Sequence, residues 1–411
     1  MATTTTETDG DRTQDSARGP LSGFRVLDLS RMLAGPYCAA LLADLGAEVI
    51  KIEMPVRGDD ARSIGPFRNG ESIYFDILNR RKKSVTLNFK SQSARQLFFH
   101  IVQHSDVVVE NFRPGVTTNL GIDYDAVAAV NPRIVYASIS GFGQSGPMAF
   151  YPAYDLIVQA ASGLMSVTGF PDGPPTKVGE SIGDLAAGVF AALAISTALV
   201  DVGHTGKGTH LDVSMLECLL ALEVTIQSEY DASGVAPPRV GNRHPVSTPF
   251  GVYAAKDGFV VLAAANNAIF ERVAELIDRP EMAHDPEYAT DELRTEHEPD
   301  IRRAIEAWAA NRTVTEVVAE AEHLGVPTSP ISDFADAVSS EHVRARGAMS
   351  KFEHPAAGTI SYVGQPVRFS GYRTLQPVPS PILGNDTDEV LSALAGVSSE
   401  QLSELHREGA L

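Results

Sequence analysis

Asp184 stands where a carboxylate could act as a nucleophile. It follows Gly179-Glu-Ser-Ile-Gly183 and precedes Leu185–Val200, a run of small apolar residues that predicts a helix. Aspartate is also a favoured helix N-cap, because its carboxylate accepts a hydrogen bond from a backbone N–H of the first turn. A carboxylate among small neighbours can instead attack an activated acyl group and hold it covalently. The pattern by itself favours the N-cap, and the two roles are compatible.

Two other motifs suggest a phosphorylated ligand. Gly141-Phe-Gly143-Gln-Ser-Gly146 matches G-x-G-x-x-G, but Pro147 follows where a dinucleotide fingerprint must open a helix. We therefore expect a glycine-rich loop that a ligand can approach closely. The basic run 80–83, with Lys90 behind it, is either a solvated surface or a docking patch for a charged nucleotide.

Several kinds of site are absent from the sequence. The 11 histidines show no metal-ligand spacing, so no metal is predicted. The sequence also contains neither the phosphate-binding G-x-x-x-x-G-K-[ST] loop nor a G-x-S-x-G nucleophile elbow.

Composition narrows the class of protein further. Among 411 residues, 33 are Lys or Arg and 52 are Asp or Glu, so the net charge is −19. Such a surface disfavours a nucleic-acid partner. Only two cysteines occur, Cys38 and Cys218, which excludes a disulfide scaffold and suits a reducing cytoplasm. The longest apolar run falls short of the roughly 18 residues of a membrane span, and the N-terminus lacks a signal pattern. We therefore expect a cytoplasmic protein that is not bound to a membrane.

Strands and helices alternate along the first half of the chain. The expected strands are Phe24–Leu29, Ala47–Glu53, Val107–Phe112 and Arg133–Ser140, and the expected helices are Pro36–Leu45, Ala94–Gln103 and Tyr124–Val130. This order predicts a parallel sheet covered on both faces, which binds ligands beyond the carboxyl ends of its strands. The segments expected there are polar or glycine-rich: Ser30–Gly35, Glu53, Asn111–Arg113 and Gly141–Gly146.

The pattern divides the chain into an α/β fold of two domains. Residues 1–20 are almost devoid of apolar side chains and predict a disordered tail. Residues 21–225 with 349–411 form the large domain, residues 226–249 a polar linker, and residues 250–348 a small α+β domain. After Ala348 we expect strands at Thr359–Val363 and Val367–Phe369, then helices at 386–394 and 399–407.

Taken together, these segments resemble the class III (family III) CoA-transferases. That superfamily includes formyl-CoA:oxalate CoA-transferase and shares its fold with α-methylacyl-CoA racemase. The resemblance runs from Leu21 almost to the C-terminus, and in order and spacing it is specific. Its carriers are Leu21–Ser30, Ala34–Pro36, Leu42–Glu53, Asp106–Gly115, Asn131–Tyr136, Ser140–Pro147, Gly206–Gly208 and Leu383–Leu391.

The resemblance implies roles for individual residues. It makes Asp184 the catalytic nucleophile. It places Leu33 and Ala34 over the ligand, Leu87 to Lys90 at the adenine and phosphate end of CoA, Asn111, Phe112 and Arg113 near the pantetheine, and Tyr154 and Asp155 near the thioester. Two positions depart from the family. Met54 replaces a phosphate-binding arginine, for which Arg57 or another basic residue is the expected substitute, and Gly241–Pro249 replaces a run of four glycines, which argues against oxalate and formate as substrates.

The implied reaction moves CoA from an acyl-CoA, with succinyl-CoA or another dicarboxylic thioester as candidates, to a free carboxylic acid. It passes through an aspartyl mixed anhydride and an aspartyl-CoA thioester on Asp184. CoA and acyl-CoA are substrates, and no tightly bound cofactor is implied. The family further implies a large Rossmann-like CoA-binding domain and an interlocked homodimer.

Two alternatives to the transferase remain. One is a 2-methylacyl-CoA racemase. That branch uses a histidine where this chain has Tyr154, and a phenol with a pKa near 10 is poorly suited to proton transfer at neutral pH. The other is a catalytically inactive acyl-CoA-binding paralogue, against which the intact Asp184 argues.

Overall fold

The computed structural model describes residues 18–411. The predicted tail at 1–20 therefore lies almost wholly outside the described residues. The described chain divides into two compact units. The large unit contains the residues up to Ser162, Val178–Thr225 and Ala345–Leu411, and the small unit contains Gly163–Lys177 and Ile226–Arg344. Residues 163–177 thus group with the small unit, although the sequence pattern places them in the large domain.

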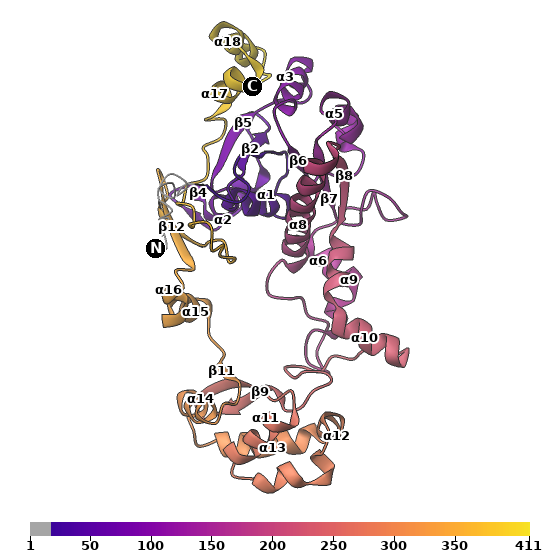
Figure 1. Ribbon diagram of the computed structural model, residues 1–411, viewed down its shortest axis with the longest axis vertical. Coiled ribbons are helices and arrows are strands. Elements are labelled where there is room, and N and C mark those ends of the chain that lie inside the picture. The colour runs from indigo at the N-terminus through magenta and orange to yellow at the C-terminus, as the bar shows by residue number, and fades with distance from the viewer. Residues whose placement is uncertain (1–17) are drawn as a thin grey trace, which may run out of the picture. The chain divides into compact units, whose positions relative to one another are not determined.

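A parallel sheet is the centre of the large unit (Figure 1). Within the described residues it has six strands, in the order β5-β2-β1-β6-β7-β8, and every neighbouring pair is parallel. Their bounds are β1 Arg25–Asp28, β2 Glu48–Glu53, β5 Lys82–Thr86, β6 Val107–Glu110, β7 Val135–Ser140 and β8 Thr209–Ser214. The chain runs outward from β1 in one direction and from β6 in the other, which is the doubly wound order with its switch point between those two strands. The predicted Rossmann-like parallel sheet is confirmed.

Helices cover both faces of this sheet. On one face α1 (Ala34–Asp44) packs against α8 (Ile182–Thr205), and on the other lie α3 (Gln92–Val102), α5 (Tyr124–Val130) and α17 (Thr387–Ala395). The second face buries one apolar cluster, which includes Leu27, Ile50, Phe98, Val108, Tyr136 and Leu391. Each fully buried side chain of this size stabilises the fold by roughly 1.5–3 kcal/mol.

The contact between α1 and α8 depends on one glycine. A Cβ atom at Gly188 would lie 2.8 Å from the carbonyl oxygen of Ala34 and 2.9 Å from Cδ1 of Tyr37. Any side chain there would force the two helices apart, so only glycine allows this approach. The N-terminal turns of α1 and α8 meet because of it.

By length and composition α8 could cross a membrane, although the sequence analysis judged its apolar run too short. Half of its most apolar stretch is buried inside the protein, where the helix packs against α1, β7 and β8. A core helix of a protein without membrane spans meets the same criteria of length and composition.

The C-terminal segment returns to the large unit. The backbone N–H of Thr86 donates to Oγ1 of Thr387, and that of Asn88 donates to the carbonyl of Ala410 at 2.9 Å. Both predicted C-terminal helices are confirmed, as α17 and α18 (Ser399–Arg407). The predicted strand at 367–369 is wrong, because β13 (Gly358–Val363) pairs instead with β12 (Met349–His354) in a hairpin.

The basic run 80–83 is neither a solvated surface nor a docking patch. Arg80 is buried in an ion pair with Asp44, and the fully buried Lys82 donates to Oδ2 of Asp28 at 2.8 Å. Lys83 pairs with Glu48 at 3.2 Å. Strand β5 begins at Lys82. Because the partners of these charged side chains are distant in sequence, the basic run gives no local signal for that strand.

The small unit has its own core. Strands β9 (Phe250–Ala255), β10 (Gly258–Ala263) and β11 (Thr328–Pro330) form an antiparallel sheet. Helices α11 (Asn267–Leu276), α13 (Glu298–Ala309) and α14 (Val314–His323) pack on it and bury Phe270, Ile305, Trp308 and Val317. Part of the segment predicted to be a linker is helical, as α10 (Val224–Ser233).

Candidate active site

Two adjoining cavities lie beyond the carboxyl ends of the sheet strands in the large unit. The first, here the β2-side cavity, has a volume of about 360 Å³ and is lined from the ends of β1, β2, β5 and β6. The second, the Asp184 cavity, has a volume of about 430 Å³ and lies beyond β6 and β7. Arg31, Asp60 and Phe112 line both, so the two cavities are neighbours at the switch point of the sheet.

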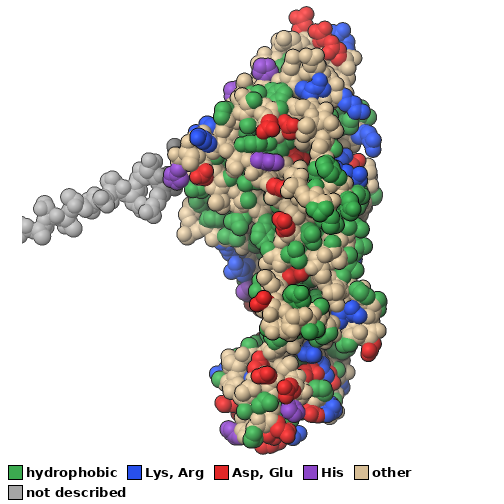
Figure 2. Space-filling view, turned by 90° about the vertical axis from the view of Figure 1, so that its right-hand side faces the viewer, with side chains coloured by type: hydrophobic (Ala, Val, Ile, Leu, Met, Phe, Trp, Pro, Cys, Tyr) green, Lys and Arg blue, Asp and Glu red, His purple; other side chains and the backbone are tan. Residues whose placement is uncertain are grey.

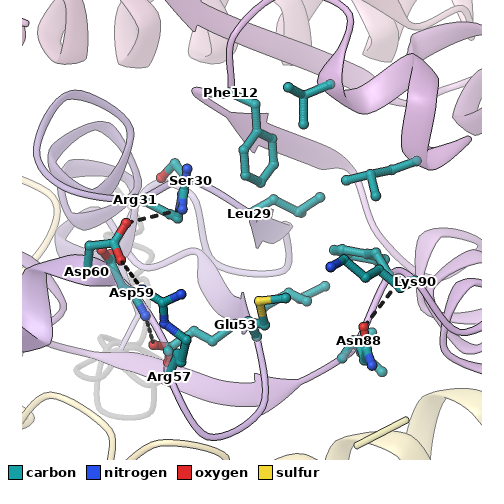
Figure 3. Close-up of a pocket in the computed structure, with 17 residues that line it drawn as sticks. Leu29, Ser30, Arg31, Glu53, Arg57, Asp59, Asp60, Asn88, Lys90 and Phe112 are labelled. Atoms are coloured by element: carbon teal, nitrogen blue, oxygen red, sulfur yellow. Dashed lines mark hydrogen bonds and ion pairs between the residues drawn. The ribbon is translucent and has the colours of Figure 1, made fainter.

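The β2-side cavity combines an apolar centre with charged margins. Leu29 and Phe112 lie toward its middle, and Lys90 with Asn88 lies opposite Arg31 and Asp60 (Figure 3). The Arg57 guanidinium is largely exposed and lies 3.9 Å from Asp60. An apolar slot with cations at its margin suits an aromatic ring that carries phosphates.

Asp184 is the third residue of α8 and faces its cavity from the first turn. The predicted N-cap role of Asp184 is wrong. The residue at the N-cap is Ser181, and the carboxylate that binds an N–H of the first turn is Asp155, whose Oδ1 accepts from Gly183 at 2.8 Å. Gln159 fixes Asp155 by donating to Oδ2 at 2.7 Å. With the N–H of Gly183 already bonded by Asp155, the Asp184 carboxylate is not needed there.

The surroundings of Asp184 tune its ionisation. Burial, and then the negative charge of Asp155, raise the pKa of Asp184 to about 7, while the dipole of the Ala34 backbone N–H acts in the opposite direction. Poor solvation makes the ionised carboxylate more reactive toward an acyl carbon, and with a pKa of about 7 a fraction of Asp184 is ionised near neutral pH.

Tyr74, which the sequence does not single out, lines neither cavity but lies within electrostatic range of Asp184. It belongs to α2 (Ile73–Leu78) and is half-buried. Burial and the negative charges of Asp184, Asp59 and Glu180 raise the pKa of Tyr74 above its usual range, so its phenol keeps its proton near Asp184. An aromatic residue at the start of a short helix carries no local signal that it lies near a carboxylate from a distant part of the chain.

The residues predicted to contact CoA separate into three groups. Leu87, Lys90 and Phe112 line the β2-side cavity. Ala34, Asn111, Arg113 and Tyr154 line the Asp184 cavity, together with Phe112. Leu33 is buried beside Ala34, and Asp155 bonds Gly183; neither lines a cavity.

Their side chains differ in how freely they can meet a ligand. Oδ1 of Asn111 accepts from the Arg31 N–H at 2.8 Å, and its Nδ2 donates to the Arg31 carbonyl at 2.7 Å, so this amide is committed to the protein backbone. Arg113 is exposed and forms no ion pair with any residue in the described part of the chain. The Tyr154 side chain is 70% exposed.

The glycine-rich segment at 141–146 forms turns and opens no helix. Its Gln144 N–H donates to both carboxylate oxygens of Asp212 at 3.0 Å, which holds the loop against β8. A close-approach loop fits this geometry, and a dinucleotide fingerprint does not. Within residues 18–411 no group of three metal-ligating side chains gathers at one place.

The fold and the site define an α/β protein whose sheet has, at its switch point, a cavity suited to a nucleotide-bearing ligand and a carboxylate beside it. The chain belongs to CoA-transferase family III, whose family model matches residues 21–387. The resemblance inferred from the sequence is thereby confirmed.

Curated relatives and solved structures agree with this assignment. The chain is 43% identical over 356 residues to acetyl-CoA:oxalate CoA-transferase from Acetobacter aceti, covering 86% of this chain and 90% of that protein. It is 38% identical to succinyl-CoA:glutarate CoA-transferase from Mus musculus, covering 90% and 86%. A CaiB/BaiF family protein from Brucella suis superposes with a TM-score of 0.81 at 34% identity, covering 92% of this chain and all of that one. The chain is a CoA-transferase, as expected over the racemase and the inactive paralogue.

Proposed function

We propose that Asp184 is the nucleophile of this CoA-transferase, and that it carries first the donor acyl group and then CoA. The observation that carries the proposal is its place: a poorly solvated carboxylate in the first turn of α8 that lines a cavity. A carboxylate nucleophile divides one exchange between two acids into steps that pass through covalent intermediates on the enzyme.

The proposed steps balance without a net proton. An Asp184 oxygen attacks the donor thioester carbonyl, the C–S bond breaks, and CoA leaves as a thiolate beside a mixed anhydride. The thiolate attacks the Asp184 carbonyl carbon and releases the donor acid, which leaves an aspartyl-CoA thioester. The acceptor carboxylate displaces CoA from that thioester to give a second anhydride. The thiolate then attacks the acceptor carbonyl, so the new acyl-CoA forms and the Asp184 carboxylate is restored.

For CoA we propose an extended position across both cavities. Lys90 and Arg57 are the cations suited to its phosphates in the β2-side cavity, with Leu87 against the adenine. Phe112, which lines both cavities, lies where the pantetheine would pass toward Asp184. Binding energy from this remote half of CoA holds the thioester at the nucleophile.

For both acids we propose the dicarboxylic class. The relatives are named for oxalate, glutarate and mesaconate. Arg31 and Arg113 line the Asp184 cavity in a chain whose net charge is −19. The lack of a glycine run at Gly241–Pro249 favours succinate or a longer diacid over oxalate.

We further propose that the active form is a cytoplasmic homodimer, interlocked as in its family. Hydrophobic side chains gather on the face of the large unit that carries α8 and α9 (Met215–Leu222) (Figure 2). Leu193 and Val200 on α8 are 62% exposed, and Leu222 on α9 is 53% exposed. Apolar area of this kind is typical of a surface that a partner covers. Sedimentation of the purified protein tests the homodimer, and a monomer at micromolar concentration contradicts it.

The test of Asp184 compares Asp184→Asn with Asp201→Asn, an exposed aspartate near the other end of the same helix. We expect Asp184→Asn to lose CoA exchange between succinyl-CoA and free diacids while it still binds CoA, and Asp201→Asn to keep it. Hydroxylamine added during turnover of the parent should leave a hydroxamate on the peptide that contains Asp184. Exchange by Asp184→Asn above a few per cent of the parent rate contradicts the assignment.

A further inference from the structure

The first turn of α8, which carries Asp184, is held by a side chain from another helix. α6 (Asp155–Ser162) packs against α8 in the large unit (Figure 1). Asp155 is the first residue of α6, and its Oδ1 accepts a hydrogen bond from the Gly183 N–H at 2.8 Å. Because Gly183 immediately precedes Asp184, this bond fixes the backbone beside the proposed nucleophile.

Residue 183 allows this approach because it is a glycine. A Cβ atom there would lie 2.8 Å from Cγ2 of Val158 and 3.1 Å from Oδ1 of Asp155. A side chain would therefore push α6 away from the first turn of α8 and weaken the bond that Asp155 accepts. The position of Asp184 thus depends on a close contact between these two helices.

Gln159 holds the Asp155 carboxylate in this orientation. It lies one turn further along α6 and is fully buried. Its Nε2 donates to Oδ2 of Asp155 at 2.7 Å, and its Oε1 accepts from the Val178 N–H at 3.0 Å. Nε2 also lies 3.4 Å from the carbonyl oxygen of Glu180. One buried amide thus joins the carboxylate that bonds Gly183 to the segment that leads into α8.

The groups that this amide joins border the Asp184 cavity. Tyr154, the residue before Asp155, lines that cavity together with Asp184. Gln159 and Asp155 themselves line neither the Asp184 cavity nor the β2-side cavity. The network therefore joins the backbone beside two residues of the cavity wall, while its own side chains lie outside the space that a substrate would occupy.

We propose that Gln159 is a positioning residue for CoA transfer: it holds Asp155 against the first turn of α8 and so keeps the Asp184 carboxylate where it meets the thioester carbonyl. The inference rests on the proposed function, in which Asp184 is the nucleophile. Gln159 acts through the backbone of that turn. Its effect on rate can be large, because a displacement of the reacting group by about 1 Å can slow a reaction roughly a hundredfold.

The first experiment compares Gln159→Leu with Asn131→Leu by kcat and KM for succinyl-CoA and by melting temperature. Asn131 is a matched control, because its amide likewise holds a distant part of the chain, donating to the carbonyls of Val102 at 3.0 Å and Ser105 at 2.8 Å, and because it lines neither cavity. Both substitutions should lower the melting temperature. Gln159→Leu should also lower kcat roughly tenfold to a hundredfold and leave KM within about twofold of the parent, because the loss occurs at the nucleophile and not in CoA binding. Asn131→Leu should keep the parent kcat.

The second experiment exchanges the amide and the carboxylate. In Asp155→Asn two NH₂ groups face each other, so one amide must turn over, and either the Gly183 N–H or the Val178 N–H loses its acceptor. In the double variant Asp155→Asn/Gln159→Glu, the new amide can donate to the new carboxylate, and both N–H groups keep an acceptor oxygen. We expect Asp155→Asn to lower kcat roughly tenfold and the double variant to recover to within about threefold of the parent.

The proposal is overturned if Gln159→Leu loses no more of kcat than Asn131→Leu does. A double variant whose kcat is no higher than that of Asp155→Asn overturns it as well. If Gln159→Leu does not fold, the double variant decides, and if the double variant does not fold, the comparison with Asn131→Leu decides. The hydroxamate on Asp184 in the parent tests the nucleophile separately, so a failed nucleophile and a failed positioning role are distinguishable.

Discussion

The ionised Asp184 carboxylate, which suits the reaction, lowers the stability of the folded protein. Its pKa of about 7 in the folded state exceeds the unfolded value of about 3.9, so the folded state holds this proton more tightly. The free energy of unfolding therefore falls as pH rises from about 4 to about 7, and the whole penalty is present above pH 7.

Asp184→Asn removes that penalty. We expect the variant to be more stable than the parent by about 1–3 kcal/mol at pH 8, and the gain to shrink toward pH 5. Thermal unfolding of both proteins across this range measures it. Glu110, whose pKa burial also raises to about 7, contributes equally to both proteins and cancels. Asp201→Asn is the matched control, and a gain that is the same at pH 5 and pH 8 would contradict the explanation.

The family resemblance implies that Lys90 and Arg113 contact CoA, and in the structure each of them lines a cavity. We expect Lys90→Ala and Arg113→Ala each to raise KM for acyl-CoA about five- to tenfold with little change in kcat, because both contacts exist before and during the reaction. Lys207→Ala, an exposed lysine away from both cavities, serves as the control. Steady-state kinetics with succinyl-CoA and acetyl-CoA separate two roles for Arg113. A loss confined to succinyl-CoA would assign it to the distal carboxylate instead of CoA.

At the scale of the elements, the alternation of strands and helices predicts the sheet well because those signals are local. The strand β5 is missed because it begins with Lys82 and Lys83, whose charges are neutralised by Asp28 and Glu48 from other strands. The capping of α8 is misassigned for the same reason, since the carboxylate from Asp155 lies 28 residues from Gly183. Pairings between residues that are distant in the chain are not visible in one sequence. Family motifs therefore predict Asp184 and the residues of the cavities, but they do not predict the side chains that hold these residues in place.

Gly188 and Gly203 lie on the same helix and should respond in opposite ways. A Cβ at Gly188 meets the backbone of α1 at 2.8 Å, whereas nothing lies within 4 Å of one at Gly203. We expect Gly188→Ala to cost about 1–3 kcal/mol of stability and to lower kcat, because it moves α1 away from α8 and so alters the cavity that Ala34 and Asp184 both line. Gly203→Ala should instead stabilise the protein by about 0.5–1 kcal/mol, since alanine is the better helix former, and leave kcat unchanged. Chemical denaturation measures the stability of each variant, and activity assays measure its kcat. Equal changes in stability and kcat for the two substitutions would contradict the argument from the contact between α1 and α8.

At the scale of the whole molecule, the first and last parts of the described chain build one unit. The apolar cluster against the sheet joins Leu27 and Phe98 to Leu391 and Leu402. The β2-side cavity depends on this closure, because Asn88 lines it while its N–H donates to Ala410 at 2.9 Å and its Nδ2 donates to the Gly409 carbonyl at 3.0 Å. Residues far from Asp184 in sequence thus hold the loop that carries Lys90.

Deletion of residues 409–411 should therefore act on CoA binding as well as on stability. The deletion removes both acceptors of Asn88 and the buried Ala410 and Leu411, while α18 remains. We expect the melting temperature to fall and KM for acyl-CoA to rise several-fold, with kcat nearly unchanged, because the loss is confined to the remote half of the ligand. Leu411→Ala removes packing but keeps both acceptors, so it should lower the melting temperature and leave KM near that of the parent. If the deletion and Leu411→Ala raise KM equally, the C-terminus stabilises the fold without shaping the cavity.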